Sequence, residues 1–258
     1  MRPSEAMLTQ IRKKSICELV NAQGSVSVNA LCDRFNVSPS TIRNDLRDLE
    51  SAHMIERTHG GAMSNRKAVY EPNTAQKSSQ FINEKILIAQ AALRHIQPGD
   101  AIALDSGTTT YQLAHLLGGF ERLTVVTYDL QIAAWLESNT DVSIIMAGGM
   151  VRRNFHCTVG QTVVEELSAF HPDKLFLAAN SVSINGLFTP SVEMAAIKSA
   201  LIRSADHVYL LADSGKFDRK SFVRFGMPED VETLITDQQA DARVIASLRE
   251  KGLQIELA

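Results

Sequence analysis

The chain has 258 residues, with 26 Lys and Arg against 29 Asp and Glu and a formal net charge of −3. Hydrophobic residues make up 45% and charged residues 21%, which excludes a disordered acidic or low-complexity protein. No apolar run reaches the roughly 18–20 residues of a membrane helix, and the first residues lack the apolar core of a secretory signal. We therefore expect no membrane partner. The near-neutral charge argues against a protein that simply coats a polyanion, but it leaves room for a local DNA-binding face.

Three cysteines, Cys17, Cys32 and Cys157, share no metal-ligand spacing and are odd in number. This usage suits the reducing cytoplasm. The histidines are scattered, and the adjacent His156 and Cys157 cannot easily orient on each other as a catalytic pair. We expect a cytoplasmic protein with no metal site, no cofactor and no catalytic residues.

Composition divides the chain into two parts. Residues 1–66 hold nine Lys and Arg against seven Asp and Glu, about +2, which leaves about −5 for the remainder. The stretch 64–80 is polar, contains a proline and has no apolar period, which is typical of a linker. The expected organisation is an N-terminal module over 1–63, a linker over 64–80 and a larger domain over 81–258.

The N-terminal module is predicted to hold three helices and a β-hairpin. The first helix ends at Gln23-Gly24, a short strand covers 26–28, and a second helix closes at Asn36. A third helix opens with Ser38 as N-cap and Pro39 at its first position. Its apolar residues recur at helical spacing and are expected to face inward: Ile42, Leu46 and Leu49. Residues 54–57 and the pair Gly60-Gly61 indicate the hairpin.

Two short helices joined by a tight turn, the second with exposed donors near its start, suit a helix-turn-helix that enters the major groove. Arginine can bind guanine through two hydrogen bonds, and asparagine can bind adenine in the same way. The residues expected to face DNA on the third helix are Ser38, Ser40, Thr41, Arg43, Asn44 and Arg47. Arg57 and His59 on the hairpin are expected to reach the flanking DNA as a wing does, and Arg12, Lys13 and Lys14 to meet phosphates.

The same pattern also suits a protein-binding or structural module. Its basic residues alternate with Asp45, Asp48 and Glu50, which is common on a helix that is merely solvated. Asp45 can alternatively hold a neighbouring arginine in position.

After a helix predicted over 81–96, apolar strands alternate with amphipathic stretches. Strands are predicted over 101–104, 123–126, 142–146, 175–179, 207–212, 233–236 and 253–257. Strands this apolar on both faces, separated by helices, indicate a mainly parallel sheet covered by helices, and right-handed crossovers would make it doubly wound. The fold class is therefore α/β.

Ligands of open α/β sheets bind beyond the carboxyl ends of the strands, and here those ends are rich in glycine, hydroxyls and cations. In the run 105–110, DSGTTT, Gly107 permits a close turn, and Thr108 and Thr109 stand where a helix begins, so that free N–H groups and hydroxyls can hold a phosphate. Lys216 adds a point charge, and Asp105 suits sugar hydroxyls. The other candidates at strand ends are Thr127, Gly148, Arg152 and Asn180.

Each of these signals has a plainer explanation. An Asp-Ser-Gly loop after a strand is often only a turn and helix cap, and turn glycines such as Gly148 are ubiquitous. Arg152 follows the Gly148-Gly149 turn but equally suits an exposed surface.

The run Ser38 to Leu46, SPSTIRNDL, followed by Leu49-Glu50 and by 57–62, RTHGGA, closely resembles the DeoR-type family of bacterial transcription regulators. Arg12, Ile16 and Val20 match the upstream arginine and aliphatics of that pattern. The resemblance covers nearly the whole chain, since the C-terminal motifs look like the family's phosphosugar sensor domain, which is related in fold to ribose-5-phosphate isomerase. It implies a winged helix-turn-helix joined to a larger doubly wound α/β sensor domain, with effector contacts that include Asn180 and Glu193.

The sequence departs from that family at two positions. Thr127-Tyr128-Asp129 stands where members often have Thr-Asn-Ser, and Asn180 stands where the isomerase relatives carry an acidic residue. An amide cannot act as a general base, so isomerisation there is disfavoured. Glu193 and Lys198 remain as candidates for acid–base chemistry, but a carboxylate and a lysine five residues apart equally suit a surface pair.

The resemblance implies a DNA-binding regulator, expected to repress a sugar-utilisation operon, whose partners are a double-stranded DNA operator and a phosphorylated sugar. A homo-oligomer, dimer or tetramer, is expected because paired helices meet paired half-sites. The alternative is a sugar-phosphate isomerase-like enzyme with an appended helical module.

Overall fold

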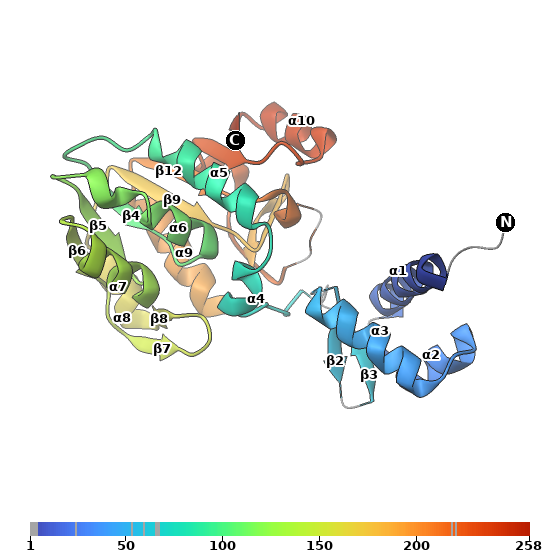
Figure 1. Ribbon diagram of the computed structural model, residues 1–258. Coiled ribbons are helices and arrows are strands. Elements are labelled where there is room, and N and C mark those ends of the chain that lie inside the picture. Colours follow the sequence, from blue (N-terminus) through green and yellow to red (C-terminus); the bar gives the residue numbers. More distant parts are fainter. Residues whose placement is uncertain are drawn as a thin grey trace. The chain divides into compact units, whose positions relative to one another are not determined.

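A computed structural model describes residues 5–23, 25–52, 54–58, 60–64, 68–217, 219 and 221–258 of the chain. They belong to two compact units, Met1–Tyr70 and Glu71–Ala258. The division falls inside the stretch 64–80 that composition suggested as a linker. The second part of that stretch belongs to the larger unit, where Thr74–Ser78 forms helix α4 (Figure 1).

The described part of the smaller unit combines helices with a small antiparallel sheet. Its elements are α1 (Glu5–Gln23), β1 (Ser25–Ser27), α2 (Val28–Phe35), α3 (Pro39–Ser51), β2 (Glu56–Thr58) and β3 (Gly61–Met63). The strands lie in the order β1-β3-β2. The predicted hairpin is present, and β1 adds a third strand to it. Val28, expected in the strand, instead begins α2, because the Ser27 side chain accepts a hydrogen bond from the Ala30 amide and caps the helix.

Local chemistry explains where α3 begins and which side it buries. Ser38 caps the helix through the Thr41 amide, with Pro39 in the first turn. Ile42, Leu46 and Leu49 are buried, as their spacing predicted. They share one apolar core with residues of α1 and α2, which include Ile16, Val20 and Leu31. The helix-turn-helix is therefore held by a core of its own.

The larger unit is built on a seven-stranded sheet in the order β15-β14-β12-β9-β4-β5-β6 (Figure 1). Its strands are β4 (Ala101–Leu104), β5 (Thr124–Thr127), β6 (Ser143–Met146), β9 (Lys174–Ala178), β12 (His207–Leu211), β14 (Thr233–Thr236) and β15 (Gln254–Leu257). All six pairings are parallel. Every predicted strand is confirmed within one or two residues, as is the prediction of a parallel sheet.

Helices cover both faces of this sheet because successive strand residues point to opposite sides. Ile102 and Leu104 pack with α5 (Ile82–Leu93), α6 (Thr108–Ala114) and α7 (Leu130–Asn139). Ala103 packs on the other face with α8 (Gln161–Ser168), α9 (Val192–Ser204) and α10 (Ala242–Glu250). The fold is the doubly wound α/β class that the sequence predicted. The helix expected over 81–96 ends earlier, since the amides of 94–96 bond to carbonyls only three residues back.

Short elements that the sequence did not predict surround the carboxyl edge of the sheet. They are the hairpin β7 (Met150–Arg152) and β8 (Cys157–Val159), and the small sheet of β10 (Ser181–Ser183), β11 (Gly186–Thr189) and β13 (Val223–Gly226). Single turns of 3-10 helix lie at η1 (Leu117–Gly119), η2 (Ser214–Lys216) and η3 (Pro228–Asp230). No helix in the described ranges is long and apolar enough to span a membrane.

Candidate functional site

A pocket lies beyond the carboxyl ends of β4 and β9, where the strand order reverses. From β4 the chain proceeds to β5 and β6 on one side, and then returns to place β9 on the other. Open α/β sheets bind ligands at such a switch point because the two loops there diverge and leave a crevice. The empty space of this pocket, counted together with the open solvent at its mouth, is about 730 Å³.

The loop after β4 forms one wall of the pocket. Ser106, Gly107, Thr108 and Thr109 line it, and α6 begins at Thr108 with no side chain capping its first turn. The explanation of this loop as a side-chain helix cap is therefore not what the structure shows. Thr110, in contrast, is fully buried, and its hydroxyl donates to the carbonyls of Asp105 and Gly107, which fixes the loop.

Asp105 lies beneath the pocket and does not line it. Its carboxylate accepts from the Ala178 amide at 2.8 Å and from the Tyr128 hydroxyl, and it forms an ion pair with Lys198. The side chains of Asp105 and Lys198 are 0% and 3% exposed. The Asp105 oxygens thus serve an internal framework that joins β4, β5, β9 and α9. Burial raises the pKa of the Tyr128 hydroxyl well above its ordinary value, and the Asp105 charge adds to the rise, so this hydroxyl stays a donor.

The surface pair suggested for Glu193 and Lys198 is wrong. Lys198 is buried and also donates to the Ala178 carbonyl at 2.9 Å, because it faces the sheet from α9. Glu193 is exposed in the first turn of α9, where Ser191 donates to it at 3.2 Å, and it lies outside the pocket lining.

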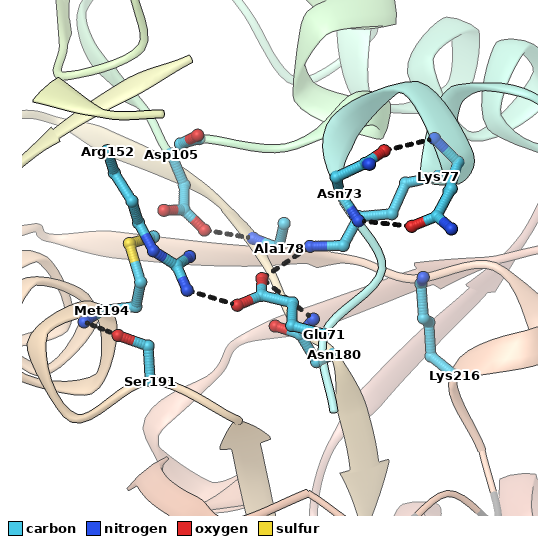
Figure 2. A network of polar contacts seen from close by, with 12 residues as sticks. Glu71, Asn73, Lys77, Asp105, Arg152, Ala178, Asn180, Ser191, Met194 and Lys216 are labelled. Atoms are coloured by element: carbon cyan, nitrogen blue, oxygen red, sulfur yellow. Dashed lines mark hydrogen bonds and ion pairs between the residues drawn. The ribbon is translucent and has the colours of Figure 1, made fainter. Parts of the chain in front are cut away.

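Glu71 places a carboxylate inside the pocket, among the side chains drawn in Figure 2. It accepts from Lys77 Nζ at 2.7 Å, from Arg152 at 2.8 Å and from the Asn180 amide at 3.4 Å. Burial alone would raise the pKa of the Glu71 carboxyl, but the cations Lys77 and Arg152 outweigh it and hold the pKa below its ordinary value. Glu71 is therefore ionised and neutralises part of the pocket's positive charge.

Lys216 brings a further cation to the pocket from η2. Its ammonium lies 3.7 Å from Asp213, beyond hydrogen-bond distance, and Asp213 Oδ2 has no hydrogen-bond partner among the residues that the structure describes. The neighbouring Lys85 is buried and donates to the carbonyls of Lys77 and Gln80 at 2.5 and 2.6 Å. Burial, followed by the charge of Lys216, lowers the pKa of Lys85 to about 8. Positive charge is thus concentrated around this side of the pocket.

The loop after β5 supplies Asp129. Its carboxylate caps α7 through the amides of Gln131 and Ile132 and accepts from the Ser106 hydroxyl at 2.7 Å. Burial raises the pKa of the Asp129 carboxyl, while the Ser106 hydrogen bond opposes the rise. At the two positions where the sequence departs from the family pattern, Tyr128 therefore belongs to the buried framework and Asp129 to the pocket wall.

Six of the ten residues predicted to bind the effector line the pocket, and four do not. The six are Gly107, Thr108, Thr109, Arg152, Asn180 and Lys216. Asp105 and Thr127 are buried, and the Thr127 hydroxyl donates to the Leu104 carbonyl. The Gly148 amide bonds instead to Glu166. Arg152 lines the pocket and forms an ion pair with Glu71, so the alternative that it lies on an exposed surface is wrong.

Sequence reasoning missed several lining residues, among them Glu71, Thr74, Lys77, Ser106 and Lys198. The first three fall in the stretch expected to be a linker, where no apolar period marks a packed element. Ser106 could have been predicted, since it belongs to the DSGTTT run. Cys157 also lines the pocket, and burial raises the pKa of its thiol to about 11, which keeps it protonated.

In the smaller unit, α3 presents an exposed polar face. Ser38, Ser40, Arg43, Asn44 and Arg47 are exposed, and Thr41 is half-buried. Arg47 donates to the Asn44 side chain at 2.9 Å, which aligns the two on one face. No described residue forms an ion pair with Arg43.

The acidic residues of this helix serve other contacts. Asp45 is buried and forms an ion pair with Arg12 of α1 at 2.6 Å, and Asp48 pairs with Lys13. Asp45 thus holds an arginine in position, although one from another helix. Glu50 binds Arg57 of β2 at 3.4 Å. His59, predicted to contact DNA with Arg57, lies outside the described residues.

The two units define a class of protein: a helix-turn-helix with an exposed polar face, joined to an α/β domain with a polar pocket at its switch point. Proteins of this class are transcription regulators that sense a ligand. The sequence pattern of the DeoR-like helix-turn-helix domain matches residues 12–68, and that of the DeoR C-terminal sensor domain matches residues 80–238. The chain belongs to the DeoR family of DNA-binding transcription regulators.

Full-length relatives support this assignment. The glycerol-3-phosphate regulon repressor of Escherichia coli is 34% identical over 95% of this chain and 98% of its own. The regulator GlpR of Haloferax volcanii is 34% identical over 96% and 98%, and the uncharacterised regulator YulB of Bacillus subtilis is 32% identical over 96% of each chain. Among solved structures, ribose 5-phosphate isomerase A of Methanocaldococcus jannaschii aligns with 54% of this chain and 55% of its own, at a TM-score of 0.41 and 14% identity.

Proposed function

We propose that this protein is a repressor that binds operator DNA through α3 and is controlled by a phosphorylated sugar or polyol bound in the pocket of the larger unit. One observation carries the effector class: hydroxyls and cations converge at the switch point. Ser106, Thr108 and Thr109 offer hydroxyls on one wall, and Lys77, Arg152 and Lys216 offer positive charge on the other. A ligand with both a polyol chain and a phosphate matches both walls.

The relatives' names agree with this chemistry. Relatives in Escherichia coli, Shigella flexneri and Haemophilus influenzae are named glycerol-3-phosphate regulon repressors. A putative aga operon transcriptional repressor of Escherichia coli is 31% identical over 96% of the chain. This supports a repressor acting on carbohydrate genes in the cytoplasm.

DNA binding is assigned to the exposed face of α3. Arg43 and Asn44 stand where a recognition helix presents side chains to base edges, and Ser38 and Ser40 stand at its start, where phosphates dock. Arg57 and His59 are proposed to contact the flanking DNA from the hairpin. Such modules read paired half-sites as dimers, so we propose a homo-oligomer, dimer or tetramer.

Control of DNA binding requires that the effector prefer one of two arrangements of the protein. A ligand shifts the equilibrium only by the difference between its affinities for the two arrangements. Glu71 supports such a coupling, because it lines the pocket and directly follows the smaller unit.

The effector assignment is tested by thermal unfolding of the full chain against a panel of phosphorylated sugars and polyols and their unphosphorylated parents. A phosphorylated compound is expected to raise the Tm of the wild type, and Lys216→Ala is expected to weaken that rise. If no phosphorylated compound shifts the Tm, the effector assignment is wrong. Turnover of a bound phosphosugar would instead favour the isomerase-like enzyme.

The DNA assignment is tested by binding to the promoter of the protein's own or a neighbouring operon at fixed salt. Arg43→Ala removes a side chain that can bind a base through two hydrogen bonds, worth about 1–3 kcal/mol, or roughly 5- to 150-fold in Kd. Arg249→Ala, an exposed arginine of the larger unit, is the matched control. Equal binding by both variants and the wild type would refute the role of α3.

A further inference from the structure

The pocket's own carboxylate stands where an anionic ligand group is expected. Glu71 bridges Lys77 and Arg152, which approach its two oxygens separately: Lys77 and Asn180 contact Oε1, and Arg152 contacts Oε2 (Figure 2). A phosphate oxygen pair would make the same charge-assisted hydrogen bonds. The Glu71 side chain is only 9% exposed, so it fills this position and does not merely border it.

The two cations do not depend on Glu71 alone for their placement. The Arg152 guanidinium lies 3.8 Å from the centre of the Phe155 ring, and the Lys77 ammonium lies 5.4 Å from it. Cation–π contacts of this kind hold both groups beside the same aromatic ring. A cationic site would therefore persist if Glu71 withdrew.

That site is electrostatically unfavourable without an anion. Burial lowers the pKa of the Lys77 ammonium, Glu71 opposes the shift, and the charges of Lys216 and Lys198 add to it. Withdrawal of Glu71 would leave these cations facing one another in a partly buried pocket, which is costly. Exchange of the carboxylate for another anion removes that cost, so release of Glu71 and binding of an anionic ligand are coupled.

The chain on the C-terminal side of Glu71 is anchored. Asn73 and Gln76 form a reciprocal capping box at the start of α4, and the Thr74 amide donates to the Asn154 carbonyl at 3.0 Å. The Lys85 ammonium holds the end of α4. Glu71 itself is the first residue of the larger unit and directly follows Tyr70, where the smaller unit ends.

We propose that Glu71 is an internal competitor for the anionic group of the effector: it occupies the subsite of Arg152 and Lys77 when no ligand is bound, and the effector's phosphate displaces it. This proposal rests on the function proposed above. Displacement frees the residue that joins the two units and so gives ligand binding a direct effect on the chain leading to the DNA-binding unit.

The test compares Glu71→Gln with the wild type in the full chain, by calorimetric titration with inorganic phosphate and with each phosphorylated compound of the panel. Glutamine keeps the size of the side chain and removes its charge. Affinity for phosphate compounds is expected to rise at least about tenfold, as close charge pairs of this kind permit. Affinity for their unphosphorylated parents is expected to stay unchanged. Glu165→Gln, an exposed glutamate of the same unit, is the matched control.

A second variant keeps the test decisive if Glu71→Gln does not fold. Glu71→Asp retains the charge but is one methylene shorter, so it cannot span both cations, and its affinity for phosphate compounds is expected to lie between those of the wild type and the glutamine variant. If the wild type binds a phosphorylated compound and neither variant binds it more tightly, Glu71 is an ordinary part of the site and the competitor proposal is wrong. If neither the wild type nor any variant binds any phosphorylated compound, the proposed function itself fails.

Operator binding supplies an independent readout. Ligand-free Glu71→Gln is expected to shift its operator affinity toward that of the ligand-saturated wild type, because the neutral side chain loses the ion pairs with Lys77 and Arg152 that hold it in the subsite. An operator affinity equal to that of the ligand-free wild type would show that release of Glu71 is not the signal.

Discussion

Lys198→Met tests the framework beneath the pocket. The substitution removes the ammonium that pairs with Asp105 and donates to the Ala178 carbonyl, and it leaves the Asp105 carboxylate fully buried. Breaking a buried ion pair costs about 3–5 kcal/mol, because the remaining charge is uncompensated. Asp105 keeps the Tyr128 hydroxyl and the Ala178 amide, so we expect the lower end, about 3 kcal/mol. In a domain of this size that loss lowers the Tm by about 6–12 °C.

The single tryptophan, Trp135 of α7, reports the unfolding of the larger unit in urea by its fluorescence. Asp105→Asn and the double variant with Lys198→Met complete a mutant cycle. Lys198→Met is expected to lower the free energy of unfolding by about 2 kcal/mol less in the Asp105→Asn background than in the wild type, since no buried charge is then left unpaired. A loss below about 1 kcal/mol for Lys198→Met, or additive effects in the cycle, would refute this account of the framework.

Other substitutions test individual contacts. Ser38→Ala removes the cap of α3 and is expected to destabilise the smaller unit by about 1 kcal/mol, measured by hydrogen exchange of its amides. Gly61→Ala would place a methyl group 2.1 Å from the Val26 carbonyl oxygen, so the rate of amide hydrogen exchange in the smaller unit should rise strongly. The methyl group of Gly60→Ala meets nothing within 4 Å, so that rate should stay unchanged. Equal effects of the two substitutions would contradict the close packing at Gly61. The pKa of Lys85 is lowered to about 8 from 10.5, so folding disfavours its charged form, and wild-type stability should gain from this residue as pH rises from about 8 toward 10.5. Lys85→Met should lack that gain in urea unfolding at pH 8 and pH 10.

Periodicity and capping chemistry made much of the fold predictable. The strands of the sheet are apolar on both faces, as Leu175 and Phe176 illustrate by packing into opposite clusters. Ser38 and Pro39 marked the start of α3 for local reasons that the tertiary structure leaves intact. Short strands such as β7 and β10 escaped prediction because their position depends on tertiary contacts that the local sequence does not show.

The pocket was predictable where its residues follow strands and obscure elsewhere. Gly107 and Thr108 come directly after β4, so the rule for strand ends found them. Glu71 and Lys77 are adjacent to no strand, and only folding brings them to Arg152. Asp105 follows a strand, as the rule requires, but its carboxylate forms a buried ion pair with Lys198, ninety-three residues later, and so lies below the pocket.

The separation between a buried framework and the pocket wall has a consequence for engineering and for divergence within the family. Residues that hold the unit together, such as Asp105, are distinct from half-buried residues that line the pocket at the starts of helices and after β9, such as Thr108, Gln131 and Asn180. Substitutions at such half-buried lining positions are expected to cost little folding free energy. Retargeting this sensor to a new small molecule therefore requires a library of substitutions at a few lining positions. The DNA-binding unit stays unchanged and reports binding of the new ligand.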